Sequence, residues 1–471
     1  MADMKESRQL KRENMMLSMP LPKVILTMAY PTIISFLINS IYSMADIYFV
    51  SSIGTNATAA VSVNSALDSL IMVAGSLFAV GASSYIARLL GAGNRKRAEQ
   101  TLSTCFCIAF VLGFLIMLIG VSFRRPMVRL FGATETCEQY AIDYATYVLY
   151  AAPFMAASFV MNQCLRAEGS ALYSMFGMGI GGVINCFLDP VFILPWGLNM
   201  GVAGASLATA ISKLIGFVIL IIPYLRGKSM LHLSIRNVVF HATMLKEVLS
   251  VGSSSMFRTL LSILSGILIN KEAGLISDAA LACIGVTNKC MMFCFSIILG
   301  FSNGFQPVAG FNWGARKYDR VRGSFRFASR TAFLGGLAMA LITGIFAPQI
   351  IHWFSSGDAE LIRLGTLCIR MQAIALPIHA WVAIVNSMAA GLGKAKIALL
   401  LATARQGSCF IPVLYPLSRL FGAEGIASVQ AVADVLTLAL AIPSLISIRR
   451  MIREAEEQET EKTIRLEEDG S

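Results

Sequence analysis

The sequence predicts an all-α integral membrane protein, with twelve transmembrane helices in two six-helix lobes related by a pseudo-twofold axis along the membrane normal. Three observations predict this fold. The chain is 56% hydrophobic and only 14% charged, whereas about a quarter of the residues in soluble domains are charged. About twelve apolar stretches are long enough to cross a hydrocarbon core of about 30 Å. The same glycine and charge motifs also recur in both halves.

Apolar stretches between polar connectors give the helices in chain order. We expect them at residues 24–50, 57–87, 99–122, 138–164, 171–194, 202–225, 247–270, 279–308, 324–350, 360–389, 395–420 and 425–448. The predicted division is a cytoplasmic N-terminal segment at 1–20, an N-lobe at 21–226, a cytoplasmic linker at 227–246, a C-lobe at 247–450 and an acidic cytoplasmic tail at 451–471. The N-terminal segment lacks a signal-peptide pattern, so we expect it to stay attached.

Lysine and arginine in short loops indicate orientation, because such residues are enriched on the cytoplasmic side. They gather after the even-numbered helices, as at Arg95 to Arg97, at Arg316 to Arg322 and at Arg449 to Arg453. Arg124, Arg125 and Arg129, which follow the third helix, are the exception. We therefore expect both termini to be cytoplasmic. The compact loops and bare termini favour a bacterial inner membrane over a eukaryotic membrane, which is the alternative. The net charge of +11 then reflects topology and contact with membrane lipids, and scattered basic loops argue against nucleic-acid binding.

The two halves align with an offset of about 221 residues. The loop that contains Gly93 matches the one that contains Gly314, and Gly201-Val-Ala-Gly204 matches Gly422-Ala-Glu-Gly425. Because each repeat contains an even number of helices, the two copies have the same orientation in the membrane. A cleft between the lobes is then the expected substrate site.

The first helix has a polar stripe that includes Asn39, Tyr42 and Asp46. Their spacing places them on one face of the helix, which must be turned towards the lobe interior or a wet cavity. Burial disfavours an ionised carboxyl group, so Asp46 is a candidate to take up and release a proton. Carboxylate and amide oxygens also bind Na⁺, and a purely structural hydrogen-bonding role remains the third interpretation.

The fifth helix carries Asn185 and Asp189 on one face, followed directly by Pro190. Proline removes one helical hydrogen bond and tends to kink a helix, which suits an ion-dependent bend. In the second repeat, neither Asp46 nor Asp189 has a carboxylate counterpart. This asymmetry predicts that ion coupling belongs to the N-lobe.

The remaining polar residues within the helices either pair with one another or line the cleft. The substrate-cavity candidates are Asn39, Tyr42, Asp68, Asn162, Arg258 and Arg405, while Lys289, Arg370 and Asp434 have no assigned role. The ten cysteines and four histidines show no zinc spacing, so no metal site or disulfide is predicted. No hydrolase motif or nucleotide-binding loop is present, and we expect a transporter that is neither an enzyme nor ATP-driven.

Several motifs together resemble those of the multidrug and toxic compound extrusion (MATE) family. They include MADIYFVSSIGT, LLGAGN, RAEGS followed by INCFLDPVFI, GVAGASLATAIS and FQPVAGFNWGARKYDRVR. The resemblance runs from about residue 21 to 450 and includes the duplication. It implies a central cavity and export of amphipathic, often cationic, drugs in exchange for H⁺ or Na⁺.

By motif position, the resemblance implies that Asp46, Asn185 and Asp189 couple transport to the ion. It also implies that Thr209 belongs to this set of ion-coupling residues. If the ion is Na⁺, the resemblance places it at Asp46, Asn185 and Asp189. No other cofactor is implied, and we expect a monomer. Some members of the family have an acidic residue in the seventh helix, where this chain has Arg258 as its only charge. The alternative function is a flippase for a lipid-linked saccharide or a similar amphiphile.

Overall fold

The structure is a computed structural model that describes residues 2–194, 197–352 and 359–469, and these residues are almost entirely helical. The prediction of an all-α fold in two lobes is confirmed. The helices are α1 Ala2–Ser18, α2 Leu21–Ser51, α3 Thr55–Gly91, α4 Arg95–Ser122, α5 Arg124–Leu130, α6 Glu138–Ala167, α7 Ala171–Ile193, α8 Gly201–Leu225, η1 Ile235–Asn237, α9 Ala242–Ile276, α10 Asp278–Gly314, α11 Tyr318–Ile345, α12 Ala347–His352, α13 Ala359–Gly391, α14 Ala395–Thr403, η2 Ala404–Ser408 and α15 Phe410–Asp469.

Within the described residues, eleven helical segments are long and apolar enough to span a membrane. The last of these contains two crossings, because α15 is broken at Gly422, where φ is 56°. The eleventh helix is not the uninterrupted span expected at 395–420. It consists of α14, the π-helical turn η2 and the start of α15. Most of the expected helices are a few residues too short, because the observed helices extend beyond the apolar stretches into polar sequence.

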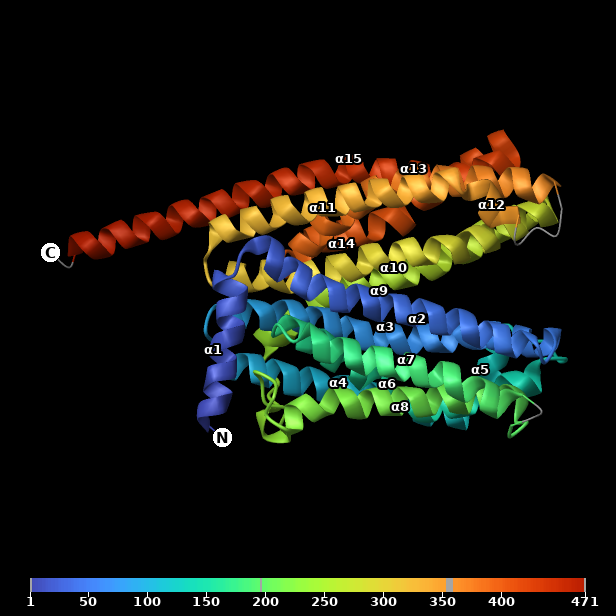
Figure 1. The fold of residues 1–471 in the computed structure, drawn as a ribbon, viewed down its shortest axis with the longest axis horizontal. Helices are drawn as coiled ribbons and strands as arrows, with labels where there is room; N and C mark the ends of the chain where they lie inside the picture. Colours follow the sequence, from blue (N-terminus) through green and yellow to red (C-terminus); the bar gives the residue numbers. More distant parts are fainter. Residues whose placement is uncertain (1, 195–196, 353–358, 470–471) are drawn as a thin grey trace.

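Helices α2 to α8 form one bundle and α9 to α15 form the other, and we call these the N-lobe and the C-lobe (Figure 1). The repeat is visible in the turns as well as in the helices. Gly201 and Gly422, at matching positions, both have positive φ, and so do Gly169 and Gly393. This backbone conformation strongly favours glycine. The matching motifs in the sequence are therefore matching turns in the structure.

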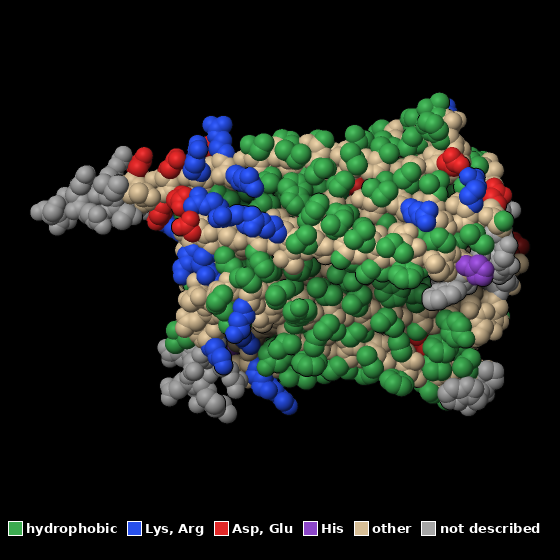
Figure 2. Space-filling model, turned by 45° about the horizontal axis from the view of Figure 1, so that its top comes forward, with side chains coloured by type: hydrophobic (Ala, Val, Ile, Leu, Met, Phe, Trp, Pro, Cys, Tyr) green, Lys and Arg blue, Asp and Glu red, His purple; other side chains and the backbone are tan. Residues whose placement is uncertain are grey.

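Both termini lie at one end of the molecule, which we call the basic end because lysine and arginine gather there (Figures 1 and 2). On the face shown in Figure 2, apolar side chains cover most of the surface between this end and the opposite one. From the basic end towards the opposite end, the ribbons of the two lobes diverge (Figure 1).

Near the basic end, the lobes are in direct backbone contact. A Cβ atom added at Gly81 of α3 would lie 2.0 Å from the carbonyl oxygen of Val248 in α9, and one at Gly252 would lie 1.7 Å from the carbonyl oxygen of Leu77. Farther along the interface, the hydroxyl groups of Ser40 and Ser296 are 2.6 Å apart. Small residues allow helices to approach this closely. The lobes are thus tightly packed from the basic end to about mid-depth.

The sequence predicted only a cytoplasmic segment before the first membrane helix. In the structure this segment contains helix α1, which lies across the basic end (Figure 1). Arg12 forms an ion pair of 3.7 Å with Glu168 and donates a hydrogen bond to the carbonyl of Lys228, both on the N-lobe side. On the C-lobe side, Arg320 and Asn312 donate hydrogen bonds to the carbonyl of Met16. Helix α1 therefore bridges the two lobes.

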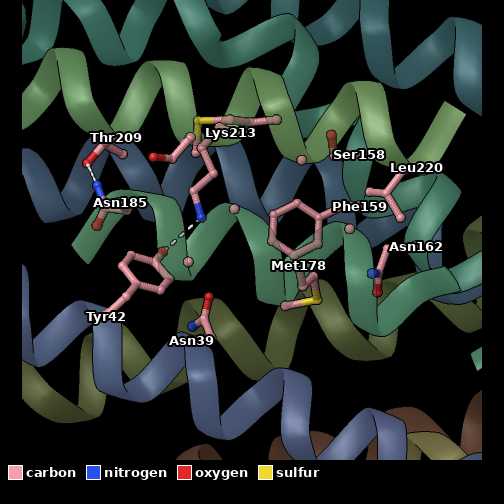
Figure 3. A pocket seen from close by; sticks show the side chains of 16 residues that line it. Asn39, Tyr42, Ser158, Phe159, Asn162, Met178, Asn185, Thr209, Lys213 and Leu220 are labelled. Carbon is pink, nitrogen blue, oxygen red and sulfur yellow. Dashed lines mark hydrogen bonds between the residues drawn. The ribbon is translucent and has the colours of Figure 1, made fainter. Parts of the chain in front are cut away.

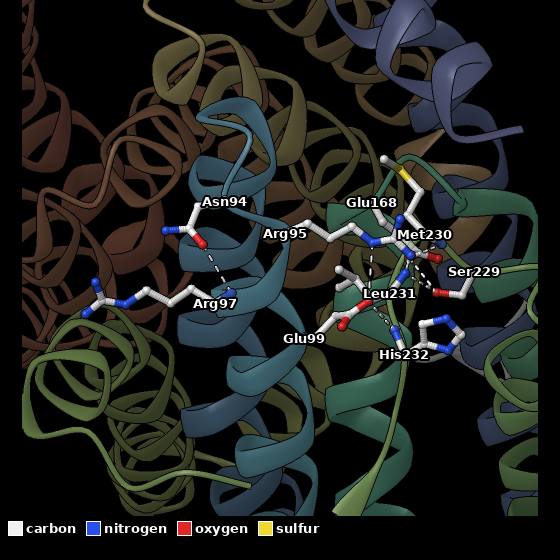
Figure 4. Close-up of polar contacts among 9 residues, drawn as sticks. All are labelled: Asn94, Arg95, Arg97, Glu99, Glu168, Ser229, Met230, Leu231 and His232. Carbon is white, nitrogen blue, oxygen red and sulfur yellow. Dashed lines mark hydrogen bonds and ion pairs between the residues drawn. The ribbon is translucent and has the colours of Figure 1, made fainter. Parts of the chain in front are cut away.

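Glu168, in the RAEGS motif, anchors the segment between the lobes (Figure 4). Its carboxylate is fully buried and accepts hydrogen bonds from the Ser229 hydroxyl at 2.6 Å and from the backbone N–H groups of Met230 and Leu231. Burial raises the pKa of Glu168, and this effect is opposed by Arg12 and by these donors. The carboxylate holds the first turn of the linker against the end of α6.

Replacing Glu168 by glutamine is expected to lower the stability of the protein. The glutamine amide has the same shape as the carboxylate, but its NH₂ group is a hydrogen-bond donor that faces other donors. A buried polar group without a hydrogen-bond partner lowers the free energy of unfolding by about 1–3 kcal/mol. Thermal unfolding of the purified protein measures this effect. The exposed Glu135→Gln variant is the control, and equal melting temperatures for the two variants would show that Glu168 does not anchor the linker.

Candidate functional site

A cavity of about 90 Å³ lies inside the N-lobe between α2, α6, α7 and α8 (Figure 3). Its wall is mostly apolar, with a few amide and hydroxyl groups and one charged side chain, which is a composition typical of small-molecule sites. The lining residues are Asn39, Tyr42, Met155, Ser158, Phe159, Asn162, Gly177, Met178, Gly181, Gly182, Asn185, Thr209, Ser212, Lys213, Gly216 and Leu220. Helices α7 and α8 approach closely here, because a Cβ atom at Gly216 would lie 2.9 Å from the carbonyl oxygen of Gly177.

Two of the four predicted ion-coupling residues, Asn185 and Thr209, line this cavity, whereas Asp189 and Asp46 lie beside these two without lining the cavity. Asn185 donates a hydrogen bond to the Thr209 hydroxyl at 3.3 Å and thereby links α7 to α8 (Figure 3). It also donates a hydrogen bond to Asp189 at 3.1 Å. Asp189 is fully buried and Asp46 is 8% exposed. The two carboxyl groups interact electrostatically. A polar cluster drawn from three helices is thus buried within the lobe.

Several oxygens of this cluster have no hydrogen-bond partner among the described residues. They are Oδ1 of Asp46, Oδ2 of Asp189, Oδ1 of Asn185 and, in the neighbouring helix α3, Oδ1 of Asp68. Buried polar atoms are normally satisfied, so these oxygens are able to accept hydrogen bonds or protons that the described residues do not supply. Among the described residues, no three or more His, Cys, Asp or Glu side chains are grouped so that they could hold a metal ion.

Lys213, which the sequence analysis did not single out, is the charged residue of the cavity wall. It extends from α8 towards α2 and donates a hydrogen bond of 2.8 Å to the Tyr42 hydroxyl (Figure 3). It also interacts electrostatically with Asp46 and Asp68. The sequence does contain a signal for this residue, because a lysine in the middle of an apolar helix, four residues after Thr209, indicates a functional site. Lys213 offsets part of the negative charge that the three aspartates carry when ionised.

The other cavity candidates differ in position. Asn39 lines the cavity together with Tyr42. Asp68 lies near Asp46 but does not line the cavity. Asn162 lines the cavity, but its amide nitrogen donates to the Ser174 carbonyl and its oxygen accepts from Arg166. These bonds give Asn162 a structural role between α6 and α7.

Arg258 and Arg405 lie in the C-lobe and do not line this cavity. Arg405 forms an ion pair of 2.6 Å with Asp434. Its guanidinium group also lies over the ring of Phe295, 4.9 Å from the ring centroid. Lys289, in contrast, is exposed and Arg370 contacts the carbonyl of Gly344. The two lobes therefore have different polar interiors despite their common fold.

Comparison with known proteins agrees with this architecture. The chain is 27% identical to the multidrug export protein MepA of Staphylococcus haemolyticus over 434 residues, which is 91% of this chain and 94% of that protein. It is 25% identical to MepA of Staphylococcus aureus over 410 residues, or 86% and 89% of the two chains. The relatives are transporters and not enzymes.

Solved structures of MATE transporters have the same fold. A MATE protein crystallised with MaL6 superimposes with a TM-score of 0.88 at 23% identity, covering 95% of this chain and 99% of that one. A multidrug-resistance MATE transporter in an outward-facing conformation gives 0.87 at 24% identity, covering 94% and 98%. A family model, MatE, matches residues 31–191 and 254–416, once in each repeat. The chain therefore belongs to the MatE family of multidrug export transporters.

Proposed function

We propose that this protein is a secondary antiporter that exports amphipathic, often cationic, compounds in exchange for H⁺ or Na⁺. The observation that carries the proposal is the enclosed cluster of Asp46, Asn185, Asp189 and Thr209 beside the N-lobe cavity. Its unpartnered oxygens bind either protons or a cation. Binding of the ion changes the charge next to the cavity and weakens the attraction for a cationic compound, which couples the two ligands.

The basic end faces the cytoplasm in this proposal, as the distribution of lysine and arginine favours. The lobes are then packed together on the cytoplasmic side and their ribbons diverge towards the outside (Figure 1), which supports an outward-facing state. Transport requires the lobe contacts at Gly81 and Gly252 to separate while the opposite end closes. We place the protein in a bacterial inner membrane as a monomer.

Transport measurements in proteoliposomes test the proposal. A fluorescent lipophilic cation is loaded, and a proton gradient and a sodium gradient are imposed separately. Export driven by one of the gradients is the expected result and identifies the coupling ion. If neither gradient drives export by folded protein, the proposal is wrong and the lipid-flippase alternative takes its place.

Alternating access also predicts that linking the lobes at mid-depth stops transport. The Ser40 and Ser296 hydroxyls are 2.6 Å apart, so cysteines at these positions are within reach of a disulfide. In a background without the native cysteines, oxidation of the Ser40→Cys/Ser296→Cys protein is expected to abolish export and reduction to restore it. Each single variant is the control. Unchanged export by the fully oxidised protein would show that the lobes need not separate here.

A further inference from the structure

Lys213 lies at the centre of a membrane-spanning helix, and the proposed function does not assign it a task. Helix α8 extends from Gly201 to Leu225, so about 18 Å of helix separates Lys213 from either end at a rise of about 1.5 Å per residue. A lysine near the end of a membrane helix can place its ammonium group at the membrane surface, but a lysine at the centre cannot. Lys213 therefore needs partners inside the protein.

The ammonium group of Lys213 is held against the cavity wall by Tyr42. Its nitrogen lies 2.8 Å from the Tyr42 hydroxyl oxygen, to which it donates a hydrogen bond, and 4.7 Å from the centroid of the same ring (Figure 3). The face of an aromatic ring attracts a cation. Both contacts keep a positive charge at a defined place on the wall of the N-lobe cavity.

Helical spacing brings this charge to the ion-coupling residues. Tyr42 and Asp46 are four residues apart on α2, and Thr209 and Lys213 are four residues apart on α8. Residues with this spacing lie one turn apart on the same face of a helix. Thr209 in turn accepts the hydrogen bond from Asn185 of α7 at 3.3 Å. The ammonium group is thus one helical turn from the cluster on both α2 and α8.

The titratable groups that surround the ammonium group come from all the neighbouring helices. The charge of Lys213 acts on Asp46 of α2 and on Asp68 of α3. Asp189 of α7 acts on Asp46, and Tyr144 of α6 interacts electrostatically with all three aspartates. Lys213 is the member of this set that carries a positive charge. The N-lobe cluster therefore already contains one cation, which is covalently attached to α8.

This cation leaves the carboxyl groups free to take up protons. A direct ion pair favours the ionised carboxylate, and the C-lobe contains such a pair at the matching position. There Asp434, which corresponds to Lys213 at the offset that matches Gly201 with Gly422, binds Arg405 at 2.6 Å. The direct partner of Lys213 is instead the neutral hydroxyl of Tyr42.

A sodium ion would have to share the same carboxyl groups with the ammonium group. Among the described residues, the oxygens without a hydrogen-bond partner include Oδ1 of Asp46 and Oδ1 of Asp68, and Lys213 acts on both of these side chains. Two cations beside the same carboxylates repel each other. A proton instead neutralises a carboxylate and adds no separate ion to the cluster.

We propose that Lys213 is a built-in cation that excludes Na⁺ from the N-lobe cluster and thereby makes H⁺ the coupling ion. Lys213 selects the ion and is not itself carried across the membrane. This inference rests on the proposed function and specifies its ion. The charge of the side chain, and not its hydrogen bond to Tyr42, is the property that excludes Na⁺.

Thermal unfolding of the purified protein tests the exclusion without transport. The melting temperature is measured in NaCl and in choline chloride at equal ionic strength, because a ligand that binds only the folded protein raises it. The variants are Lys213→Met, Lys213→Arg and Tyr42→Phe, the last of which keeps the ammonium group but removes its hydrogen bond. Lys289→Met is the matched control, since Lys289 is an exposed lysine in the membrane helix α10.

We expect Na⁺ to raise the melting temperature of Lys213→Met in a saturable way. The wild type, Lys213→Arg, Tyr42→Phe and Lys289→Met should melt at the same temperature in both salts. If Lys213→Met does not fold, Lys213→Gln takes its place with the same expectation. A specific increase with Na⁺ in the wild type, or none in the folded neutral variant, overturns the proposal.

Export from proteoliposomes separates this inference from the proposed function. A sodium gradient alone should not drive export by the wild type, but it should speed export by Lys213→Met about fivefold or more, the lower end of ordinary coupling between two ligands. If a sodium gradient drives export by the wild type, the inference fails and the proposed function stands. If neither a proton nor a sodium gradient drives it, the proposed function itself fails.

Discussion

Replacing Asp46 by asparagine is expected to reduce ion-driven export strongly while leaving the protein folded. Asparagine has nearly the same shape, so the packing of α2 against α7 and α8 is preserved, but it neither takes up a proton nor contributes a negative charge to a cation site. A coupling of 1–3 kcal/mol between ion and substrate corresponds to roughly a 5- to 150-fold effect. We expect a reduction near the upper end of that range, measured as the initial rate of dye export under the gradient that drives the wild type.

Asp189→Asn should give a similar loss, because Asn185 links Asp189 to the same cluster. The matched control is Asp319→Asn, which removes a carboxylate whose side chain is 91% exposed at the basic end. That variant should transport normally. Gradient-driven export at the wild-type rate by folded Asp46→Asn protein would remove Asp46 from the coupling mechanism.

Substitution of Gly252 by alanine is expected to open the contact between the lobes. The added Cβ would lie 1.7 Å from the carbonyl oxygen of Leu77, and because both sides of this contact are backbone, α3 and α9 must move apart. Overpacking of this kind typically costs about 1–3 kcal/mol. The closed state at the basic end is destabilised, and the transport rate falls about tenfold or more.

Gly266→Ala provides the control, because it lies on the same helix and an added Cβ would have no atom within 4 Å. Disulfide formation between cysteines at positions 40 and 296 reports the closed state independently of transport. It should slow in Gly252→Ala and stay unchanged in Gly266→Ala. Equal cross-linking in the two variants would show that the contact at Gly252 does not hold the lobes together.

The sequence predicted the fold well because the bilayer imposes strong constraints. A helix that crosses the membrane needs a long apolar stretch, and a duplicated chain displays that pattern twice. The cluster of Asp46, Asn185 and Asp189 was also predictable, because each residue interrupts an apolar helix and helical spacing places Asn185 and Asp189 on one face. The structure adds the contact with Thr209, which the family resemblance had implied.

Other features depend on contacts between distant segments. Lys213 is one polar residue in an apolar helix, and its importance follows from its contact with Tyr42, which is 171 residues away in the chain. Glu168 lies in the RAEGS motif, but the sequence alone does not show that its carboxylate is buried against the linker. The turn η2 was missed because hydropathy does not distinguish a π-helical turn from an α-helix.

Asn162 shows the opposite problem. Its polar side chain within an apolar helix suggested a cavity residue, and it does line the cavity. Both polar atoms of its side chain are nevertheless engaged with Ser174 and Arg166. A polar side chain within a membrane helix is therefore informative about function only when its hydrogen-bond partners are known.

The central claim is that a drug and an ion compete through the N-lobe cluster, and a binding measurement tests it without transport. The affinity of the purified protein for a lipophilic cation is measured while pH and Na⁺ concentration are varied separately. The account predicts that affinity falls as the coupling ion becomes more abundant, and that this dependence disappears in Asp46→Asn/Asp189→Asn. Affinity that is independent of both ions in the wild type, or the same dependence in the double variant, would contradict it.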